Sequence, residues 1–228
     1  EIPSCIQNHG LDRHQYTNIR YPFPVDPPYV PADDPCCLYL RTVTLDRKDI
    51  GQRQFLDFEG VDTCFYLWIN RAFIGYSQVS HSTSEFEITE RVHEGENEIQ
   101  VLVLKWCDGS YCEDQDKLRM TGIFRDVYLL SRPQSYIRDF TIIPEYNSDH
   151  TKGGFSVEAD ISGKDEATVS VFDAEGHRLA DRCVLGGEET GKTVNGVTAM
   201  YRHAYIEFDR PVLWNAENPY LYKLVFET

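Results

Sequence analysis

The sequence lacks the patterns that would insert the protein in a membrane or direct it for export. No apolar run approaches the roughly 20 residues that a membrane-spanning helix requires. The first residues, Glu1-Ile2-Pro3-Ser4, have neither the basic nor the apolar region of a secretory signal peptide. An initiating Met is missing too, and the sequence begins as if inside a longer one. We therefore expect no membrane contact, and we expect an excised fragment that lacks part of its chemistry.

Basic residues are also scarce. The chain has 22 Lys and Arg against 37 Asp and Glu, which gives a formal net charge of −15. Binding to nucleic acid or to an anionic membrane surface requires clustered basic side chains. The charge excludes both classes of partner and favours a soluble protein with a neutral or cationic ligand.

Motifs for a metal, a catalytic nucleophile or a bound phosphate are missing as well. There is no Cys-x-x-Cys or His-x-x-x-His pair, no Gly-x-Ser-x-Gly and no glycine-rich phosphate loop. The seven cysteines are an odd, scattered set, and Cys64 and Cys107 lie in strand-like runs typical of small buried hydrophobes. This usage predicts a reducing, cytoplasmic compartment. His9 and His14 could line a site, although packing in loops is the favoured interpretation.

Most of the chain shows the patterns of β-structure. The first 35 residues are rich in proline, which excludes helix and central strand, and no long amphipathic helix follows. Short alternating segments separated by turn residues indicate β-sandwiches, with Asn70-Arg71 placed as a hairpin turn. The first half contains seven expected strands: 37–45, 53–58, 64–69, 72–76, 82–88, 98–104 and 127–130.

Two β domains are expected, 1–133 and 134–228, with the boundary in Ser131-Arg132-Pro133-Gln134. The second has about the length of an immunoglobulin-like domain. Three glycine-containing pairs, at 153–154, 163–164 and 186–187, are expected to break its strands. Those strands are predicted at 136–145, 155–161, 167–172, 178–185, 199–208 and 221–226.

The connection from Leu104 to Val127 is the best candidate for a functional site. It holds four carboxylates, Asp108, Glu113, Asp114 and Asp116, among aromatic residues and arginines. Long loops in compact β domains are commonly functional. Carboxylate acceptors beside aromatic rings suit a neutral polyhydroxylated ligand such as a sugar. A solvated acidic loop is the equally weighted alternative.

Independent catalysis by this connection is disfavoured. Glycoside hydrolysis needs two carboxyl groups roughly 5–9.5 Å apart. Here three of the four acids are bunched on one exposed-looking segment, an arrangement more typical of solvation or of cation and hydroxyl binding. Asp116 is the acid that we single out, because a hard cation such as sodium or magnesium prefers oxygen ligands, and one Asp would need partners from elsewhere.

Several sequence segments resemble the corresponding segments of the lactose-hydrolysing bacterial β-galactosidases of glycoside hydrolase family 2. The most specific is Asp108 to Asp116 followed by Arg119 to Val127. Further segments that resemble this family occur along essentially the whole chain, at 16–22, 26–31, 58–61, 84–86, 95–97 and 213–222.

The resemblance implies an all-β chain: a jelly-roll sugar-binding domain (1–133) and an immunoglobulin-like domain (134–228), cut before a TIM barrel that carries both catalytic glutamates. It implies no catalytic residue here, a galactosyl contact from Asn18, and contacts from Asp116 to the galactose 6-hydroxyl and to sodium. The parent is expected to be a retaining, homo-oligomeric β-galactosidase that uses sodium and magnesium. A free-standing carbohydrate-binding module and a purely structural role in subunit assembly are the alternatives.

Overall fold

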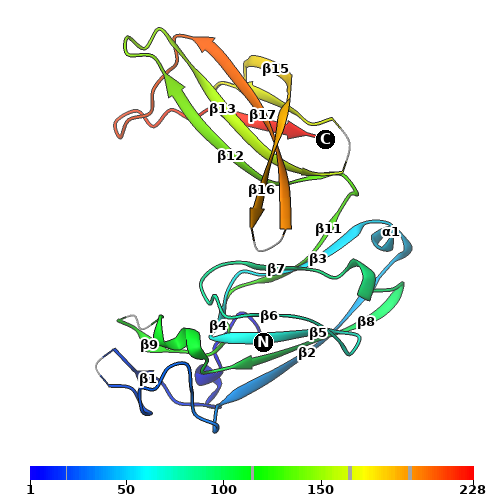
Figure 1. The fold of residues 1–228 in the computed structure, drawn as a ribbon, viewed down its shortest axis with the longest axis vertical. Helices are drawn as coiled ribbons and strands as arrows, with labels where there is room; N and C mark the ends of the chain where they lie inside the picture. Colours follow the sequence, from blue (N-terminus) through cyan, green and yellow to red (C-terminus); the bar gives the residue numbers. More distant parts are fainter. Residues whose placement is uncertain (19, 114–115, 164–165, 195–196) are drawn as a thin grey trace. The chain divides into compact units, whose positions relative to one another are not determined.

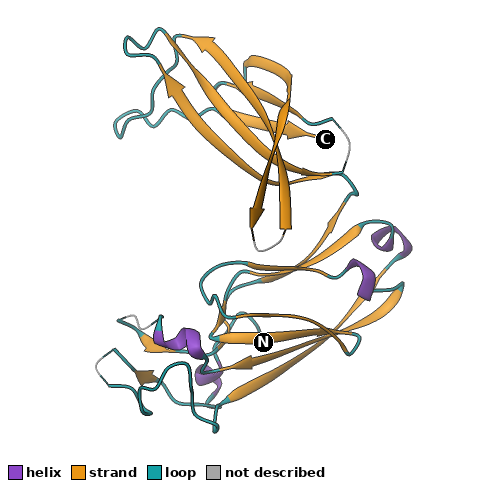
Figure 2. Ribbon diagram, in the orientation of Figure 1, coloured by secondary structure: helices purple, strands orange, loops and turns teal. Residues whose placement is uncertain are grey.

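The computed structural model describes residues 1–18, 20–113, 116–163, 166–194 and 197–228, with side chains described outside 187–200. The chain divides into two compact units, Glu1–Arg132 and Pro133–Thr228, each with its own hydrophobic core. Both units are built of strands (Figures 1 and 2), which confirms the predicted all-β class. Within these ranges, no helix is long and apolar enough to cross a membrane.

The first unit is a sandwich of two antiparallel sheets, with strand orders β2-β8-β5-β6 and β11-β3-β7. Its larger strands are β2 (Cys36–Leu45), β3 (Arg53–Phe58), β5 (Cys64–Ile69), β6 (Ala72–Ser77), β7 (Ser84–Glu87), β8 (Gly95–Leu104) and β11 (Val127–Arg132). Two-residue strands are β1 (Gln15–Tyr16), β4 (Val61–Asp62), β9 (Leu118–Arg119) and β10 (Gly122–Ile123), and short helical turns are η1 (Ile6–His9), α1 (Arg47–Ile50), η2 (Thr89–Arg91) and η3 (Asp108–Tyr111).

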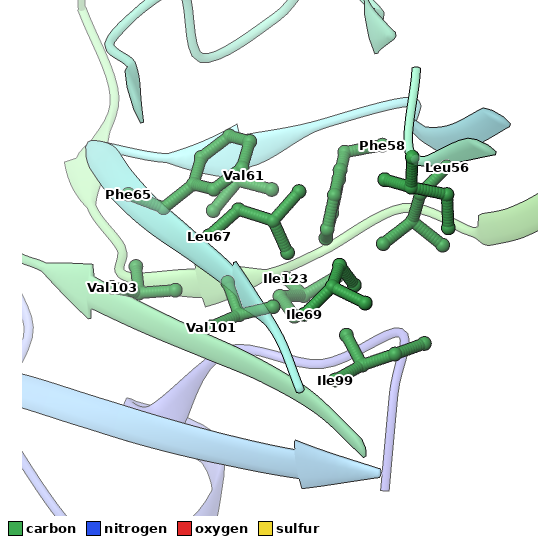
Figure 3. Packing of buried hydrophobic residues seen from close by; sticks show 11 residues of the cluster. Leu56, Phe58, Val61, Phe65, Leu67, Ile69, Ile99, Val101, Val103 and Ile123 are labelled. Atoms are coloured by element: carbon green, nitrogen blue, oxygen red, sulfur yellow. The ribbon is translucent and has the colours of Figure 1, made fainter. Parts of the chain in front are cut away.

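The period-2 pattern of β5 and β8 builds the core of this sandwich. Alternate side chains of both strands point to the inner face, where they meet Leu56 and Phe58 of β3 (Figure 3). Phe58 is 1% exposed and Leu67 is fully buried. The hairpin between β5 and β6 turns at Asn70-Arg71, as predicted, with φ values of 49° and 68° that suit a type I′ turn.

A carboxyl pair lies on the second sheet of this unit. Asp57 of β3 and Glu85 of β7 are direct cross-strand partners, and Arg132 forms an ion pair of 2.6 Å with Glu85. Like charges directly opposite each other destabilise a sheet. Burial, and then the charge of Glu85, raise the pKa of Asp57 from 3.8 to about 6.

Stability of the first unit should therefore depend on pH through Asp57. The folded state binds the Asp57 proton more tightly than the unfolded state. Binding of this proton stabilises the folded state fully below about pH 4, and the stabilisation is lost as the pH rises to about 6. Asp57→Asn should flatten this part of the pH profile and raise stability at pH 7 by on the order of 1 kcal/mol.

Urea unfolding between pH 4 and pH 8 measures this effect. Asp33→Asn is the matched control, because Asp33 is an exposed carboxylate of the same unit. An unchanged pH profile in Asp57→Asn would show that Asp57 does not hold a proton in the folded state.

The second unit is a sandwich of a four-stranded sheet, β12-β13-β17-β16, and a three-stranded sheet, β15-β14-β18. This arrangement of seven strands is that of an immunoglobulin-like domain. The strands are β12 (Tyr136–Tyr146), β13 (Lys152–Ser162), β14 (Thr168–Phe172), β15 (Arg178–Val184), β16 (Gly186–Val194), β17 (Val197–Asp209) and β18 (Lys223–Glu227).

The structure corrects two sequence-based expectations about strands. Gly153-Gly154 and Gly186 do not interrupt strands but lie within β13 and at the start of β16. The glycines were interpreted as turn residues, whereas Gly154 is needed where two backbones approach closely. Cys107, expected inside a strand, lies beyond the end of β8 and directly precedes η3, although it is buried as predicted.

Candidate functional site

The connection after β8 is held to the first unit by two short strand pairs. Residues of β9 pair with β1, so that Arg119 is opposite Gln15 and Leu118 is opposite Tyr16. Strand β10 pairs with β4 in the same antiparallel manner. The first pair brings the N-terminal segment beside residues about 100 positions later. It therefore places the two sequence-predicted ligand-binding residues in one neighbourhood.

Asp116 is the centre of that neighbourhood. Its Oδ1 accepts a hydrogen bond from Asn18 Nδ2 at 3.1 Å and another from the hydroxyl of Tyr16. All three side chains are exposed. Two donors on one oxygen fix the carboxylate plane and leave Oδ2 free of described hydrogen bonds for a hydroxyl group or a cation. Tyr16 was not among the predicted site residues.

Arg119 anchors the connection from beneath. Its side chain is 1% exposed, and its Nη2 donates to the carbonyl oxygens of Ser110 and Glu113, both at 3.2 Å. The guanidinium lies over the Trp106 ring at 5.8 Å from the centroid. These contacts tie two points of the segment that carries the acidic residues, Ser110 and Glu113, to one buried cation. The loop is therefore built into the fold.

An aromatic cluster supports the other side of the connection. Tyr111 of η3 stacks on Tyr21 with centroids 5.6 Å apart, and Phe23 packs edge-on against Trp106 at 5.0 Å. Tyr111 also donates a hydrogen bond of 2.6 Å to the carbonyl oxygen of Tyr29. The proline-rich first 35 residues thus pack on the connection through their aromatic side chains.

The remaining acids of the connection do not join Asp116. Glu113 accepts a hydrogen bond of 2.7 Å from the Ser80 hydroxyl, and Asp108 accepts one from the adjacent Gly109 amide. Asp114 lies outside the described residues. Among the residues that are described, Glu113 and Asp108 therefore have hydrogen-bond partners different from those of Asp116.

A buried acid, Asp62, supplies negative charge behind the connection. Its carboxylate is 3.3 Å from Lys117 Nζ and 3.9 Å from Arg119 Nη1. Lys117 also lies 3.3 Å from Nε2 of His81. Burial, and then the charge of Lys117, lower the pKa of His81 below its usual value. His9 and His14 are exposed, and their ring nitrogens contact the Ser4 hydroxyl and the Met120 sulfur.

The donor set at Asp116 suits a hard monovalent cation. A carboxylate and an amide oxygen are hard ligands, but two of them do not complete a coordination shell. Within the described part of the chain, the one group of three metal-ligating side chains is elsewhere, at Asp173, Glu175 and His177. A sodium ion at Asp116 would need further oxygen ligands from outside these residues.

An apolar cavity of the first unit lies away from this site. It has a volume of about 560 Å³ and opens between β2 and β11. Core side chains such as Leu56, Phe58 and Leu129 line it, with few polar groups. A sugar requires convergent hydrogen-bonding partners, so we place the candidate site at Asp116.

Comparison with known proteins identifies the family. The profile of the glycosyl hydrolases family 2 sugar-binding domain matches residues 1–133, and the glycosyl hydrolases family 2 profile matches residues 135–228. The chain belongs to glycosyl hydrolase family 2. Its first unit is accordingly a jelly-roll domain and its second an immunoglobulin-like domain, as predicted.

Curated relatives within family 2 are β-galactosidases. The chain is 45% identical over 227 residues to the β-galactosidase of Actinobacillus pleuropneumoniae and 41% identical to that of Staphylococcus xylosus. Each alignment covers 100% of this chain but 21% of the relative. The chain therefore spans about a fifth of the length of these enzymes.

Solved glycosidase structures share the fold. A Bifidobacterium dentium β-glucuronidase aligns with a TM-score of 0.66 at 19% identity, over 84% of this chain and 36% of the enzyme. A β-glycosidase from Bacteroides vulgatus aligns with a TM-score of 0.64 at 20% identity, over 84% of this chain and 23% of that enzyme. At such identities the likeness establishes the architecture alone.

Proposed function

We propose that this chain is the non-catalytic N-terminal part of a retaining β-galactosidase that removes terminal β-D-galactose from β-galactosides such as lactose. The contact of Asn18 with Asp116 is the observation that carries the proposal, because it assembles a sugar-binding half-site from two distant segments. The identity to β-galactosidases along the whole chain supports the galactoside as substrate.

Each residue of the half-site has a distinct role in this proposal. Asp116 accepts a hydrogen bond from the galactose 6-hydroxyl and offers an oxygen to sodium. The neutral amide of Asn18 donates to and accepts from sugar hydroxyls. Tyr16 is a positioning residue, since its hydroxyl group holds the Asp116 carboxylate.

Bond cleavage belongs to a TIM barrel of the longer polypeptide in this proposal. A double displacement needs two carboxyl groups about 5–5.5 Å apart, one as nucleophile and one as acid and base. We assign both to barrel glutamates, and the remaining sodium and magnesium ligands to the same domain. The parent enzyme is expected to be a cytoplasmic homo-oligomer.

The isolated chain should bind galactose too weakly to saturate and should not hydrolyse a chromogenic β-galactoside. Most of the pocket is contributed by other domains, so the half-site alone cannot repay the entropy lost on binding. NMR titration with galactose, with and without sodium, measures this directly. In the longer polypeptide, Asp116→Ala should lower kcat/KM about 100-fold or more and remove the response to sodium.

The control for both measurements is Asp33→Asn, which changes an exposed acid outside the connection. Hydrolysis by the isolated chain would contradict the proposal. So would an unchanged kcat/KM in the longer Asp116→Ala enzyme.

A free-standing carbohydrate-binding module is the second candidate function, and one surface favours it. Four aromatic side chains lie close together on β5 and β6. The ring centroid of Trp68 is 6.1 Å from that of Tyr66 and 5.8 Å from that of Phe73. The ring centroids of Tyr66 and Tyr76 are 4.8 Å apart. Phe73 is 55% exposed. Saturable binding of the isolated chain to a polysaccharide, lost in Phe73→Ser but not in Asp116→Ala, would favour this candidate.

A further inference from the structure

Ser80 and His81, in the segment that joins β6 to β7, form a chain of hydrogen bonds with the connection after β8. The Ser80 hydroxyl donates to the Glu113 carboxylate at 2.7 Å and lies 2.7 Å from Nδ1 of His81. On the other side of the imidazole, Nε2 lies 3.3 Å from Nζ of Lys117. The two residues therefore contact the connection at two points, Glu113 and Lys117.

The direction of each hydrogen bond follows from the chemistry at the two ends of this chain. A lysine ammonium group can only donate, so Nε2 of His81 accepts from Lys117. The imidazole is then neutral, carries its proton on Nδ1 and donates to the Ser80 oxygen. The Ser80 hydroxyl in turn donates to Glu113. The chain thus runs from a cation to an anion and requires a neutral imidazole between them.

Further contacts hold Ser80 and His81 in place. Ser80 is fully buried, and its backbone amide donates a second hydrogen bond to Glu113 at 3.4 Å. The backbone carbonyl oxygen of His81 accepts a hydrogen bond of 3.3 Å from Arg125. The imidazole ring also lies 5.1 Å from the ring of Phe124, measured between centroids. Both residues are therefore supported from outside the chain of hydrogen bonds.

The two contact points lie on either side of Asp116. Lys117 follows Asp116 directly, and Glu113 precedes it by three residues. Lys117 is held a second time, by its ion pair of 3.3 Å with the buried Asp62. A backbone that is held on both sides of a ligand-binding residue gives up less conformational freedom when the ligand binds.

We propose that Ser80 and His81 are positioning residues of the galactose half-site, which hold Asp116 in the orientation that accepts the hydrogen bond from Asn18. Both act through Glu113 and Lys117 and not through contact with the sugar. The inference rests on the proposed galactosyl role of Asp116 and adds the groups that place this carboxylate.

A positioning role for His81 makes binding of the galactoside depend on pH. The charged groups that face His81 are Lys117, Arg125, Asp62 and Glu113. Burial, and then the charge of Lys117, lower the pKa of His81 below 6.5. A protonated imidazole cannot accept from Lys117. The arrangement is therefore complete above about pH 6.5 and is lost as the pH falls through the lowered pKa.

Kinetics of the longer polypeptide on a chromogenic β-galactoside test this role. At pH 7.5, His81→Ala should raise KM about fivefold and change kcat less than about twofold, because a hydrogen bond that positions Asp116 is lost. A merely structural role would reduce the amount of folded enzyme, which lowers the apparent kcat and leaves KM unchanged. His81→Gln keeps an uncharged oxygen that can accept from Lys117, so its KM should stay within about twofold of the unmodified enzyme.

The pH profile gives a second readout. Between pH 7.5 and pH 5.5, the KM of the unmodified enzyme should rise relative to that of His81→Gln, whose side chain cannot gain a proton. His93→Ala is the matched control, since His93 is an exposed histidine of the same unit and its ring contacts the carbonyl oxygen of Glu94. Its KM and pH profile should be unchanged.

NMR of the 228-residue chain tests the same role without activity. The side-chain amide of Asn18 donates to Asp116, so its signals should shift in His81→Ala and stay in place in His93→Ala. Unchanged Asn18 signals in His81→Ala would overturn the inference, as would an unchanged KM or a raised KM that His81→Gln does not restore.

Asp116→Ala distinguishes failure of this inference from failure of the proposed function. If Asp116→Ala lowers kcat/KM while His81→Ala leaves KM unchanged, the galactosyl role of Asp116 stands and the positioning role is wrong. If neither variant changes the kinetics, the galactosyl role itself is wrong, and the inference that rests on it is overturned too.

Discussion

Replacing Gly154 by alanine should disrupt the four-stranded sheet of the second unit. A Cβ atom at this position would lie 1.8 Å from the carbonyl oxygen of Ile206 and 2.8 Å from its carbonyl carbon. Both are backbone atoms of β17, the direct partner of β13. A rotamer change cannot relieve such a clash, so the strands must separate. We expect a loss of about 3 kcal/mol or more in the free energy of unfolding of this unit.

Gly186→Ala is the matched control for this prediction. It makes the same change in β16 of the same sheet, where the nearest atom to the new Cβ is a Val184 methyl carbon at 3.9 Å. The entropy lost by the unfolded chain is the same in both variants. Hydrogen exchange of the β13 and β17 amides should accelerate sharply in Gly154→Ala alone. Equal exchange in the two variants would show that the close approach is not required for pairing.

The strands that could be predicted are those whose pattern is local. The predicted bounds of β3 and β5 coincide with the observed ones. Alternation along β3 and the run of aromatic and branched residues in β5 are both signals contained within the strand itself. Strand β16 was missed because its sequence from Gly186 to Val194 has three glycines and one apolar residue, so it carries no such pattern. A glycine in a turn and a glycine in close backbone contact are identical in sequence.

The candidate site depended on information that a local pattern cannot contain. Asn18 and Asp116 were linked by resemblance to a family, since each lies two residues beyond the pair of strands β1 and β9, which distant segments form. Tyr16 was missed, although it precedes Asn18 by two residues, the spacing that places side chains on one face of an extended segment.

Arg119→Met should loosen the connection that carries Asp116. The substitution keeps an unbranched side chain over Trp106 but removes the donors to the Ser110 and Glu113 carbonyl oxygens. It also takes a cation away from Asp62, which is itself 3% exposed. Breaking a buried charged contact in this way costs about 3–5 kcal/mol. We expect that loss in urea unfolding of the first unit, together with faster hydrogen exchange across 106–118.

Arg125→Met is the control for Arg119→Met, because Arg125 makes similar contacts but is exposed. It tests whether the loss of stability depends on burial of the guanidinium. Arg125 donates to two carbonyl oxygens, at 3.4 Å and 3.3 Å, and lies 5.3 Å from the centroid of the Phe124 ring, yet it is exposed. Water can replace its contacts, so its loss should cost less than about 1 kcal/mol. The double variant Arg119→Met, Asp62→Asn should lose less than the sum of its single variants, because removing both charges leaves neither one buried alone. If Arg119→Met cost no more than Arg125→Met, the buried guanidinium would not be what anchors the connection, and the aromatic cluster around Trp106 would have to hold Asp116 in place.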